Sequence, residues 1–137
     1  MKKSPLERLM DTHPGLEIWW DSSPLIYTSW TEGMLKKAQP DRVKDLQEQL
    51  KRLYDPEHPE EALFRGVTTN PPLSLNVIKT HESLVTRLVD GLIKQNPYVD
   101  KETLFWMTYK EIIQQGARMY LGVFQRSQYR YGYLSGQ

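Results

Sequence analysis

The feature that most constrains the fold is the order of three short apolar runs separated by longer helical patterns. The runs are "LEIWW" at 16–20, "ALFRGV" at 62–67 and "YRYGYLSGQ" at 129–137, and their aromatic and branched residues are typical of β-strands. Because helical connections between neighbouring strands make those strands parallel, this order predicts an α/β fold with a parallel sheet. The runs alternate little with polar residues, so we expect both faces of the sheet to be covered, by helices or by the interior of a barrel.

Helical patterns fill most of the remaining chain, and they lie at 4–10, 25–38, 40–55, 73–95 and 101–128. The clearest is 40–55, where apolar residues recur at helical spacing from Val43 to Leu53. In 73–95 we expect a break near Thr80, because "THES" supplies new capping residues. The sequence therefore predicts a single domain over 1–137 with more helix than strand.

Composition narrows the class of function. The formal net charge of +1 gives no reason to expect a nucleic-acid partner or an anionic membrane surface. The chain has no cysteine, which excludes thiolate nucleophiles and cysteine metal sites and fits a reducing, cytoplasmic location. No window approaches the ~20 apolar residues of a membrane helix, and the N-terminal "MKKSPLERLMD" lacks the apolar core of a signal peptide. We therefore expect a cytoplasmic protein that binds neither nucleic acid nor membranes.

Motifs for metals and cofactors are weak. His13, His58 and His81 lack metal-ligand spacing, and no acidic cluster accompanies them. Neither of the common glycine-rich phosphate-binding motifs is present. The tyrosines and the arginine of 129–133 have the chemistry to stack on bases, but a core strand is the preferred interpretation of this segment. We expect no metal and no cofactor.

Polar side chains follow each predicted strand. Asp21 follows the first strand, Thr68, Thr69 and Asn70 follow the second, and Gln137 ends the third. Because the carboxyl ends of parallel strands meet at one edge, where α/β folds bind ligands, these side chains are predicted to converge on one site. A carboxylate there can move protons, and an amide can both donate and accept hydrogen bonds.

Pro71 and Pro72 directly follow Asn70 and precede a helical pattern. They would open that helix and hold Asn70 in an extended conformation. A purely structural alternative stays open for the same residues. Asp and Asn are common at helix caps and turns, and chain termini such as Gln137 are often frayed.

The stretch "GVTTNPPLS" at 66–74 resembles the signature of the transaldolase family. Pro72 and Ser74 depart from it, since the family usually has a small residue and an apolar residue at these two positions. "IWWD" is similar to the family's first strand, which ends in Asp, and "YGYLSGQ" is similar to its third strand. Gln137 stands where the family commonly has Glu and where the related fructose-6-phosphate aldolases have Gln. The resemblance covers nearly the whole chain but only the first part of the family's length.

This resemblance implies the first three β/α units of a TIM (β/α)8 barrel. It also implies an enzyme of the pentose phosphate pathway that transfers a dihydroxyacetone unit from a ketose phosphate to an aldehyde through a lysine Schiff base. Asp21 would accept and donate the proton during carbon–carbon cleavage, Asn70 would hold substrate hydroxyls, and Gln137 would order the water of carbinolamine chemistry. Thr68 and Thr69 would contribute to binding of the sugar phosphate.

The nucleophilic lysine is missing from the predicted strands. Such a lysine should end a buried strand, whereas Lys79 and Lys94 follow apolar residues only within helical patterns. A complete barrel needs ~250 residues and eight strands. We therefore expect an N-terminal piece of a longer protein, inactive alone and able to self-associate through its open sheet edge. The alternatives are a non-catalytic α/β module that binds a sugar phosphate or a partner chain, an inactive homologue, and a fructose-6-phosphate aldolase-like enzyme.

Overall fold

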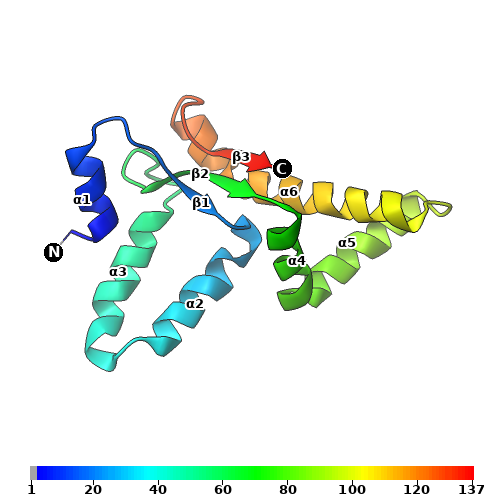
Figure 1. Cartoon of the computed structure of the whole chain (residues 1–137), viewed down its shortest axis with the longest axis horizontal. Helices are drawn as coiled ribbons and strands as arrows, with labels where there is room; N and C mark the ends of the chain where they lie inside the picture. Colours follow the sequence, from blue (N-terminus) through cyan, green and yellow to red (C-terminus); the bar gives the residue numbers. More distant parts are fainter. Residues whose placement is uncertain (1–2) are drawn as a thin grey trace.

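The computed structural model describes residues 3–137 and shows helices packed on a small sheet (Figure 1). The elements in chain order are the α-helix α1 (Pro5–Thr12), the strand β1 (Ile18–Asp21), the 3-10 helix η1 (Pro24–Ile26), α2 (Tyr27–Lys37), the 3-10 helix η2 (Pro40–Arg42), α3 (Val43–Leu53), β2 (Phe64–Thr69), α4 (Pro71–Thr80), α5 (Glu82–Gln95), α6 (Lys101–Arg126) and β3 (Tyr133–Gly136). Over these residues, no helix combines the length and the apolarity needed to cross a membrane.

The three strands form one parallel sheet in the order β1-β2-β3, which confirms the predicted α/β fold and parallel sheet. The predicted limits of the first two strands were wrong by up to two residues. β1 begins at Ile18 instead of Leu16, and Thr68 and Thr69 are the last two residues of β2 instead of following it. The expected break in 73–95 is confirmed, because α4 ends at Thr80 and α5 begins at Glu82.

The start of the third predicted strand was also wrong, because the residues before Tyr133 form a turn that leads out of α6. Gln128 and Tyr129 have φ values of 54° and 68°, and Gly132 has a φ of 88°. A Cβ at Gly132 would lie 2.6 Å from the Phe124 backbone nitrogen. Only glycine therefore fits this close return of the chain to α6.

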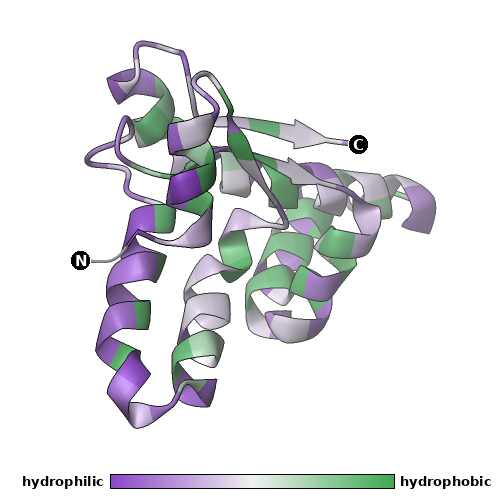
Figure 2. Ribbon diagram, turned by 60° about the vertical axis from the view of Figure 1, so that its left-hand side comes forward, coloured by the Kyte–Doolittle hydropathy of each residue, from purple (hydrophilic) through white to green (hydrophobic). Residues whose placement is uncertain are grey.

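One face of the sheet is covered by helices. Figure 1 shows α2 to α5 on the same side of the three strands. Val67 at the centre of β2 is fully buried against Tyr120 and Val123 of α6, and Trp20 and Leu134 from the neighbouring strands join this cluster. A second buried cluster joins α4, α5 and α6 through Val77, Val85 and Ile112. In Figure 2 the α2–α3 hairpin is hydrophobic on its inner side and hydrophilic on its outer side.

The other face of the sheet is exposed, which corrects the expectation that both faces are covered. The strand register places two rows of residues on this face. They are Trp19, Gly66 and Tyr133 in one row and Asp21, Thr68 and Ser135 in the next. Trp19 is 36% exposed and Tyr133 is 49% exposed. A Cβ on Gly66 would lie 2.8 Å from the Trp19 indole, so the glycine makes room for that ring.

The tyrosine-rich segment divides between core and surface. Tyr131 is buried, and the guanidinium of buried Arg65 lies 4.3 Å from the centre of its ring. Arg65 also donates to the carbonyl oxygens of Pro59 and Glu60. These two oxygens and the face of the Tyr131 ring stabilise the buried positive charge. The predicted core role is therefore confirmed for Tyr131, whereas Tyr129 and Tyr133 are exposed.

Three neighbouring tyrosines, whose rings contact one another in sequence, differ in the hydrogen-bond partners of their hydroxyls. Tyr27 Oη donates to the Leu50 carbonyl at 2.7 Å, and Tyr54 Oη donates to the Met119 carbonyl at 2.6 Å. Tyr120 is 1% exposed, and its hydroxyl has no hydrogen-bond partner within residues 3–137. Burial raises the pKa of Tyr27 to about 12 and also raises the pKa of Tyr120, so both stay neutral.

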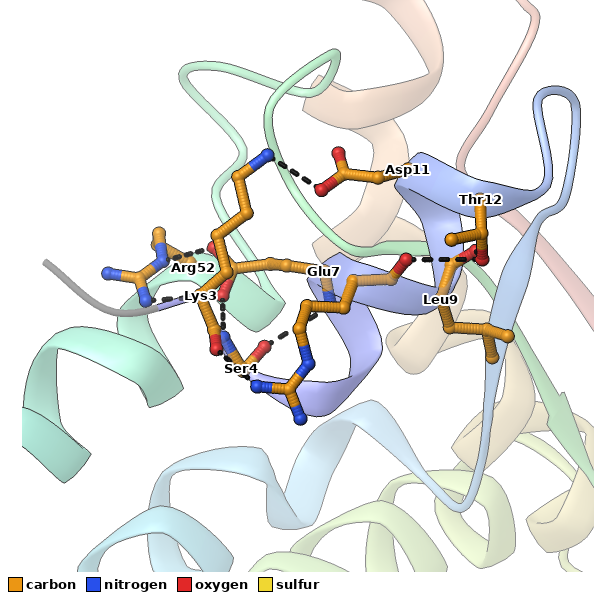
Figure 3. Close-up of polar contacts among 8 residues, drawn as sticks. Lys3, Ser4, Glu7, Leu9, Asp11, Thr12 and Arg52 are labelled. Carbon is orange, nitrogen blue, oxygen red and sulfur yellow. Dashed lines mark hydrogen bonds and ion pairs between the residues drawn. The ribbon is translucent and has the colours of Figure 1, made fainter.

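Polar contacts attach α1 to α3 (Figure 3). Ser4 and Glu7 form a capping box, in which the Ser4 N–H donates to Glu7 Oε2 at 2.6 Å and the Glu7 N–H donates to Ser4 Oγ. Arg52 Nε of α3 donates to Glu7 Oε1 at 2.8 Å. Burial raises the pKa of Glu7, but the bonds from Ser4 and Arg52 outweigh it and lower this pKa from 4.5 to about 2.

The unpaired hydroxyl of Tyr120 leads to a stability prediction. Tyr120→Phe should raise the free energy of unfolding by about 1 kcal/mol, because it removes a buried donor without a partner. Tyr54→Phe is the matched control and should lower that free energy by about 1 kcal/mol, because it removes a made hydrogen bond. Urea unfolding of both variants measures the difference. An equal loss of stability in the two variants would contradict the conclusion that the Tyr120 hydroxyl has no hydrogen-bond partner.

The lowered pKa of Glu7 predicts a pH dependence. The carboxylate is stabilised in the folded chain, so its contribution is fully present above pH 4.5 and is lost as the pH falls from there to about 2. Glu7→Gln should lower the free energy of unfolding by about 1 kcal/mol near neutral pH and should remove this part of the acid sensitivity.

Urea unfolding over that pH range tests the change. Asp11→Asn is the control, because the Lys3–Asp11 pair is exposed and should contribute less than about 0.5 kcal/mol. A pH profile of Glu7→Gln that parallels the parent profile would show that this carboxylate does not link α1 to α3.

Candidate functional site

The carboxyl ends of the three strands lie side by side along one rim of the sheet. Asp21 is opposite Thr68, and Thr68 is opposite Ser135. Backbone bonds extend this register beyond the strands, because the Ser22 N–H donates to the Thr68 carbonyl at 2.9 Å and the Gln137 N–H donates to the Thr69 carbonyl at 3.1 Å. The rim is therefore fixed by main-chain bonds on both sides of β2.

Asp21 and Thr68 are brought together on the exposed face. Thr68 Oγ1 donates to Asp21 Oδ1 at 2.8 Å. Within residues 3–137, the second carboxylate oxygen of Asp21 has no hydrogen-bond partner, and the side chain is exposed. This oxygen is therefore free to accept a hydrogen bond, or a proton, from a ligand hydroxyl.

Asn70 occupies the N-cap position of α4. Its backbone is extended, with φ −149° and ψ 171°, and its Oδ1 accepts from the Leu73 N–H at 2.9 Å. Pro71 and Pro72 fill the first two helical positions and carry no N–H. The first turn of α4 therefore leaves no backbone donor unpaired, and the side chain of Asn70 is half-buried.

Thr69 lies on the opposite face from Thr68, because successive side chains of a strand alternate. It is 3% exposed, and its hydroxyl has no hydrogen-bond partner among the described residues. The structure thus places this predicted substrate-binding hydroxyl on the helix-covered side, away from the Asp21–Thr68 pair.

Gln137 is exposed beside the end of β2. Its N–H donates to the Thr69 carbonyl, and its carbonyl accepts from Tyr109 Oη of α6 at 2.5 Å. The backbone of this residue is thus held between the sheet and a helix, and its side-chain amide makes no hydrogen bond within residues 3–137.

Ser135 is a rim residue that the sequence interpretation missed. It is exposed, and it stands in register with Thr68 on the same face as Asp21. Alternation along "YLSGQ" was the available signal, since Ser135 and Gln137 are two positions apart. The exposed face therefore carries a carboxylate and two hydroxyls in one row.

Within residues 3–137, no lysine lies on a strand, and every lysine is exposed. Lys79 lies on α4 and Lys94 lies on α5. No group of three or more His, Asp or Glu side chains in the described part of the chain is arranged to hold a metal ion. His58 Nδ1 lies 3.2 Å from Asp55 Oδ2, within hydrogen-bond distance. The rim thus offers acid–base and hydrogen-bonding groups, without an amine nucleophile.

Comparisons with protein-family models, with curated proteins and with solved structures found no match to the chain. The function is therefore inferred from two observations. One is the arrangement of Asp21 and Thr68 on the exposed rim, and the other is the motif from Gly66 to Ser74.

A matched pair of substitutions separates the two threonines. Thr69→Val should raise the free energy of unfolding by about 1 kcal/mol, because a buried hydroxyl without a partner is replaced by a methyl group of similar size. Thr68→Val removes a partly exposed bond and should change that free energy by less than about 0.5 kcal/mol. Urea unfolding measures both. A loss of stability in Thr69→Val would show that this hydroxyl is hydrogen-bonded in solution.

Proposed function

We propose that the chain forms the first three β/α units of a TIM barrel and is the N-terminal part of a transaldolase-like enzyme. The enzyme would transfer a dihydroxyacetone unit from a ketose phosphate to an aldehyde through a lysine Schiff base, a reaction of the pentose phosphate pathway. The observation that carries the proposal is the Asp21–Thr68 hydrogen bond, which lies at the carboxyl ends of adjacent parallel strands on the exposed face. Active sites of β/α barrels are built at these strand ends.

The exposed face of the sheet is consistent with the inner face of a β/α barrel. In a barrel the helices pack outside and the inward side chains of the strands fill the interior. Here the helices cover one face, and Trp19 lies on the other face together with the polar row, whereas the Tyr133 ring contacts Phe124 of α6. A large aromatic side chain on an otherwise open sheet face fits a surface that further strands enclose.

The polar groups of the rim match the steps of this reaction. Cleavage of the ketose carbon–carbon bond requires removal of a hydroxyl proton, and the free oxygen of the Asp21 carboxylate would accept it. Thr68 would hold that carboxylate in place through its bond to the other oxygen. Asn70 would hold a substrate hydroxyl, and Gln137 would order the water that leaves when the carbinolamine dehydrates to the Schiff base and returns when the Schiff base is hydrolysed.

The Schiff-base lysine is assigned to a further strand. A lysine that attacks a carbonyl near neutral pH has to be desolvated or placed beside another cation. The described lysines are exposed on helices or near the N-terminus, and none meets this condition. The 137-residue chain alone is therefore proposed to lack transaldolase activity.

A fructose-6-phosphate aldolase-like activity is the second candidate, and Gln137 favours it. This residue ends the third strand where the aldolases have Gln and transaldolases commonly have Glu. The two reactions share the Schiff base and differ in whether water or an aldehyde releases the three-carbon unit. Release of dihydroxyacetone from fructose 6-phosphate without an acceptor aldehyde would favour the aldolase.

Borohydride trapping tests the proposal on the gene product that carries this chain. With fructose 6-phosphate, borohydride should attach a three-carbon unit to one lysine, because the Schiff base is reduced after the aldehyde product has left. In Asp21→Asn, cleavage should be slower by about a hundredfold, because the proton acceptor is lost. The trapped adduct should then be the intact six-carbon sugar phosphate, and mass spectrometry distinguishes the two.

Asp41→Asn is the matched control, because Asp41 is an exposed carboxylate in η2. It should leave the three-carbon adduct and the rate unchanged. The proposal fails if the gene product yields no adduct, or if the 137-residue chain alone turns the substrate over.

A further inference from the structure

We infer that the chain has a second binding site, between α1 and the α2–α3 hairpin, for a single-chain anionic amphiphile. Such a molecule carries one carboxylate or phosphate head on an apolar tail. The residues that line this site come from α1, α2, η2 and α3 and from the residues just before α1, and none of them belongs to the strand rim. The inference therefore goes beyond the proposed function and does not depend on it.

One part of the site is an apolar cavity of about 200 Å³. Its apolar walls come from three helices, and the side chains are Leu6, Trp30, Met34, Leu46, Leu50 and Leu53. The cavity is open to solvent, since Met34 is 37% exposed. An apolar tail that fills the cavity would remove this surface from water, which is favourable.

The other part is a cationic cavity of about 430 Å³, and its charged residues are Lys3, Arg8, Arg42 and Asp45. Lys3 is paired with the exposed carboxylate of Asp11 at 2.7 Å (Figure 3). Within residues 3–137, neither Arg8 nor Arg42 forms an ion pair with a carboxylate. The three cations outnumber the one carboxylate of the cavity, so it attracts an anion, and a guanidinium suits a carboxylate or phosphate head.

The two cavities adjoin. Three residues line both of them, and they are Ser4, Pro5 and Gln49. On α3, the neighbouring residues Asp45 and Leu46 line one cavity each, so the charged and the apolar surfaces run side by side along the helix. A ligand that occupies both cavities would therefore hold its charge near the arginines and its tail against the leucines.

Charge complementarity selects the occupant. A purely apolar ligand would leave the guanidinium groups of Arg8 and Arg42 without a counter-charge, and a small anion alone would leave the apolar cavity in contact with water. One molecule with both parts satisfies both surfaces. The two cavities are also of the size of small-ligand sites, which span about 300–1,000 Å³, so the structure favours a single free molecule over a membrane surface.

Calorimetric titration with octyl phosphate, below the concentration at which it forms micelles, tests the inference on the gene product that carries this chain. Octyl phosphate should bind at least about tenfold more tightly than 1-octanol, which presents the tail alone, or inorganic phosphate, which presents the head alone. The double variant Arg8→Gln/Arg42→Gln should bind octyl phosphate about tenfold more weakly. The double variant Lys79→Gln/Lys94→Gln removes the same charge from exposed positions on α4 and α5 and should bind like the parent.

A substitution in the apolar cavity tests the tail. Met34→Glu places a carboxylate beside the expected tail and should weaken binding of octyl phosphate by at least about tenfold. Its Tm should stay within about 4 °C of the parent, because Met34 is partly exposed. A comparison of Tm values for all variants thus separates loss of the ligand from loss of the fold.

Three results would overturn the inference. The first is the absence of octyl phosphate binding, and the second is an affinity for 1-octanol within about threefold of that for octyl phosphate. The third is binding to phosphatidylglycerol vesicles without binding of monomeric octyl phosphate, which would assign these residues to a membrane surface. None of these measurements requires turnover, so a missing borohydride adduct would end the proposed function and leave this site unaffected.

Discussion

The backbone hydrogen bonds of β2 to both of its neighbours set the relative positions of the three strand ends that form the candidate site. They align the carboxyl ends of β1 and β3, and they continue past the strands at Ser22 and Gln137. The same strand directs Val67 into the helical core and Thr68 to the exposed face. The six residues of β2 therefore contribute both to the buried core on the helix-covered face and to the candidate site on the exposed face.

The helices were the most predictable part of the fold. Apolar spacing in 40–55 and capping residues near Thr80 are local signals, and α3 and the α4–α5 break follow them. The face on which each strand residue lies was less predictable. The register shifts between Ile18 and Trp19, so that Phe64 stacks on Trp20 on the helical side while Gly66 lies beneath Trp19 on the other. A bulge of this kind depends on pairing between strands, which a count of alternating residues does not reveal.

The residues of the candidate site could also be predicted only in part from the sequence. The motif around Asn70 and the Asp at the end of β1 can be identified in the sequence, and the structure brings Asp21 to Thr68. Thr68 and Thr69 look equivalent in the sequence, yet one is on the open face and the other is buried beneath it. Alternation from Gln137 indicated the face of Ser135, whereas its position opposite Thr68 depends on the pairing of β3 with β2. The polar residues at the strand ends could thus be predicted from the sequence, whereas the face of the sheet on which each side chain lies could not.

The attachment of α1 to α3 has a consequence for the order in which the chain folds. The Glu7 carboxylate and its Arg52 partner are 45 residues apart. On a ribosome that adds residues from the N-terminus, α1 emerges well before Arg52 is made. Its eight residues are too few to stay helical alone in water. The first helix of the sequence is therefore expected to be among the later ones to settle, after α3 has left the exit tunnel.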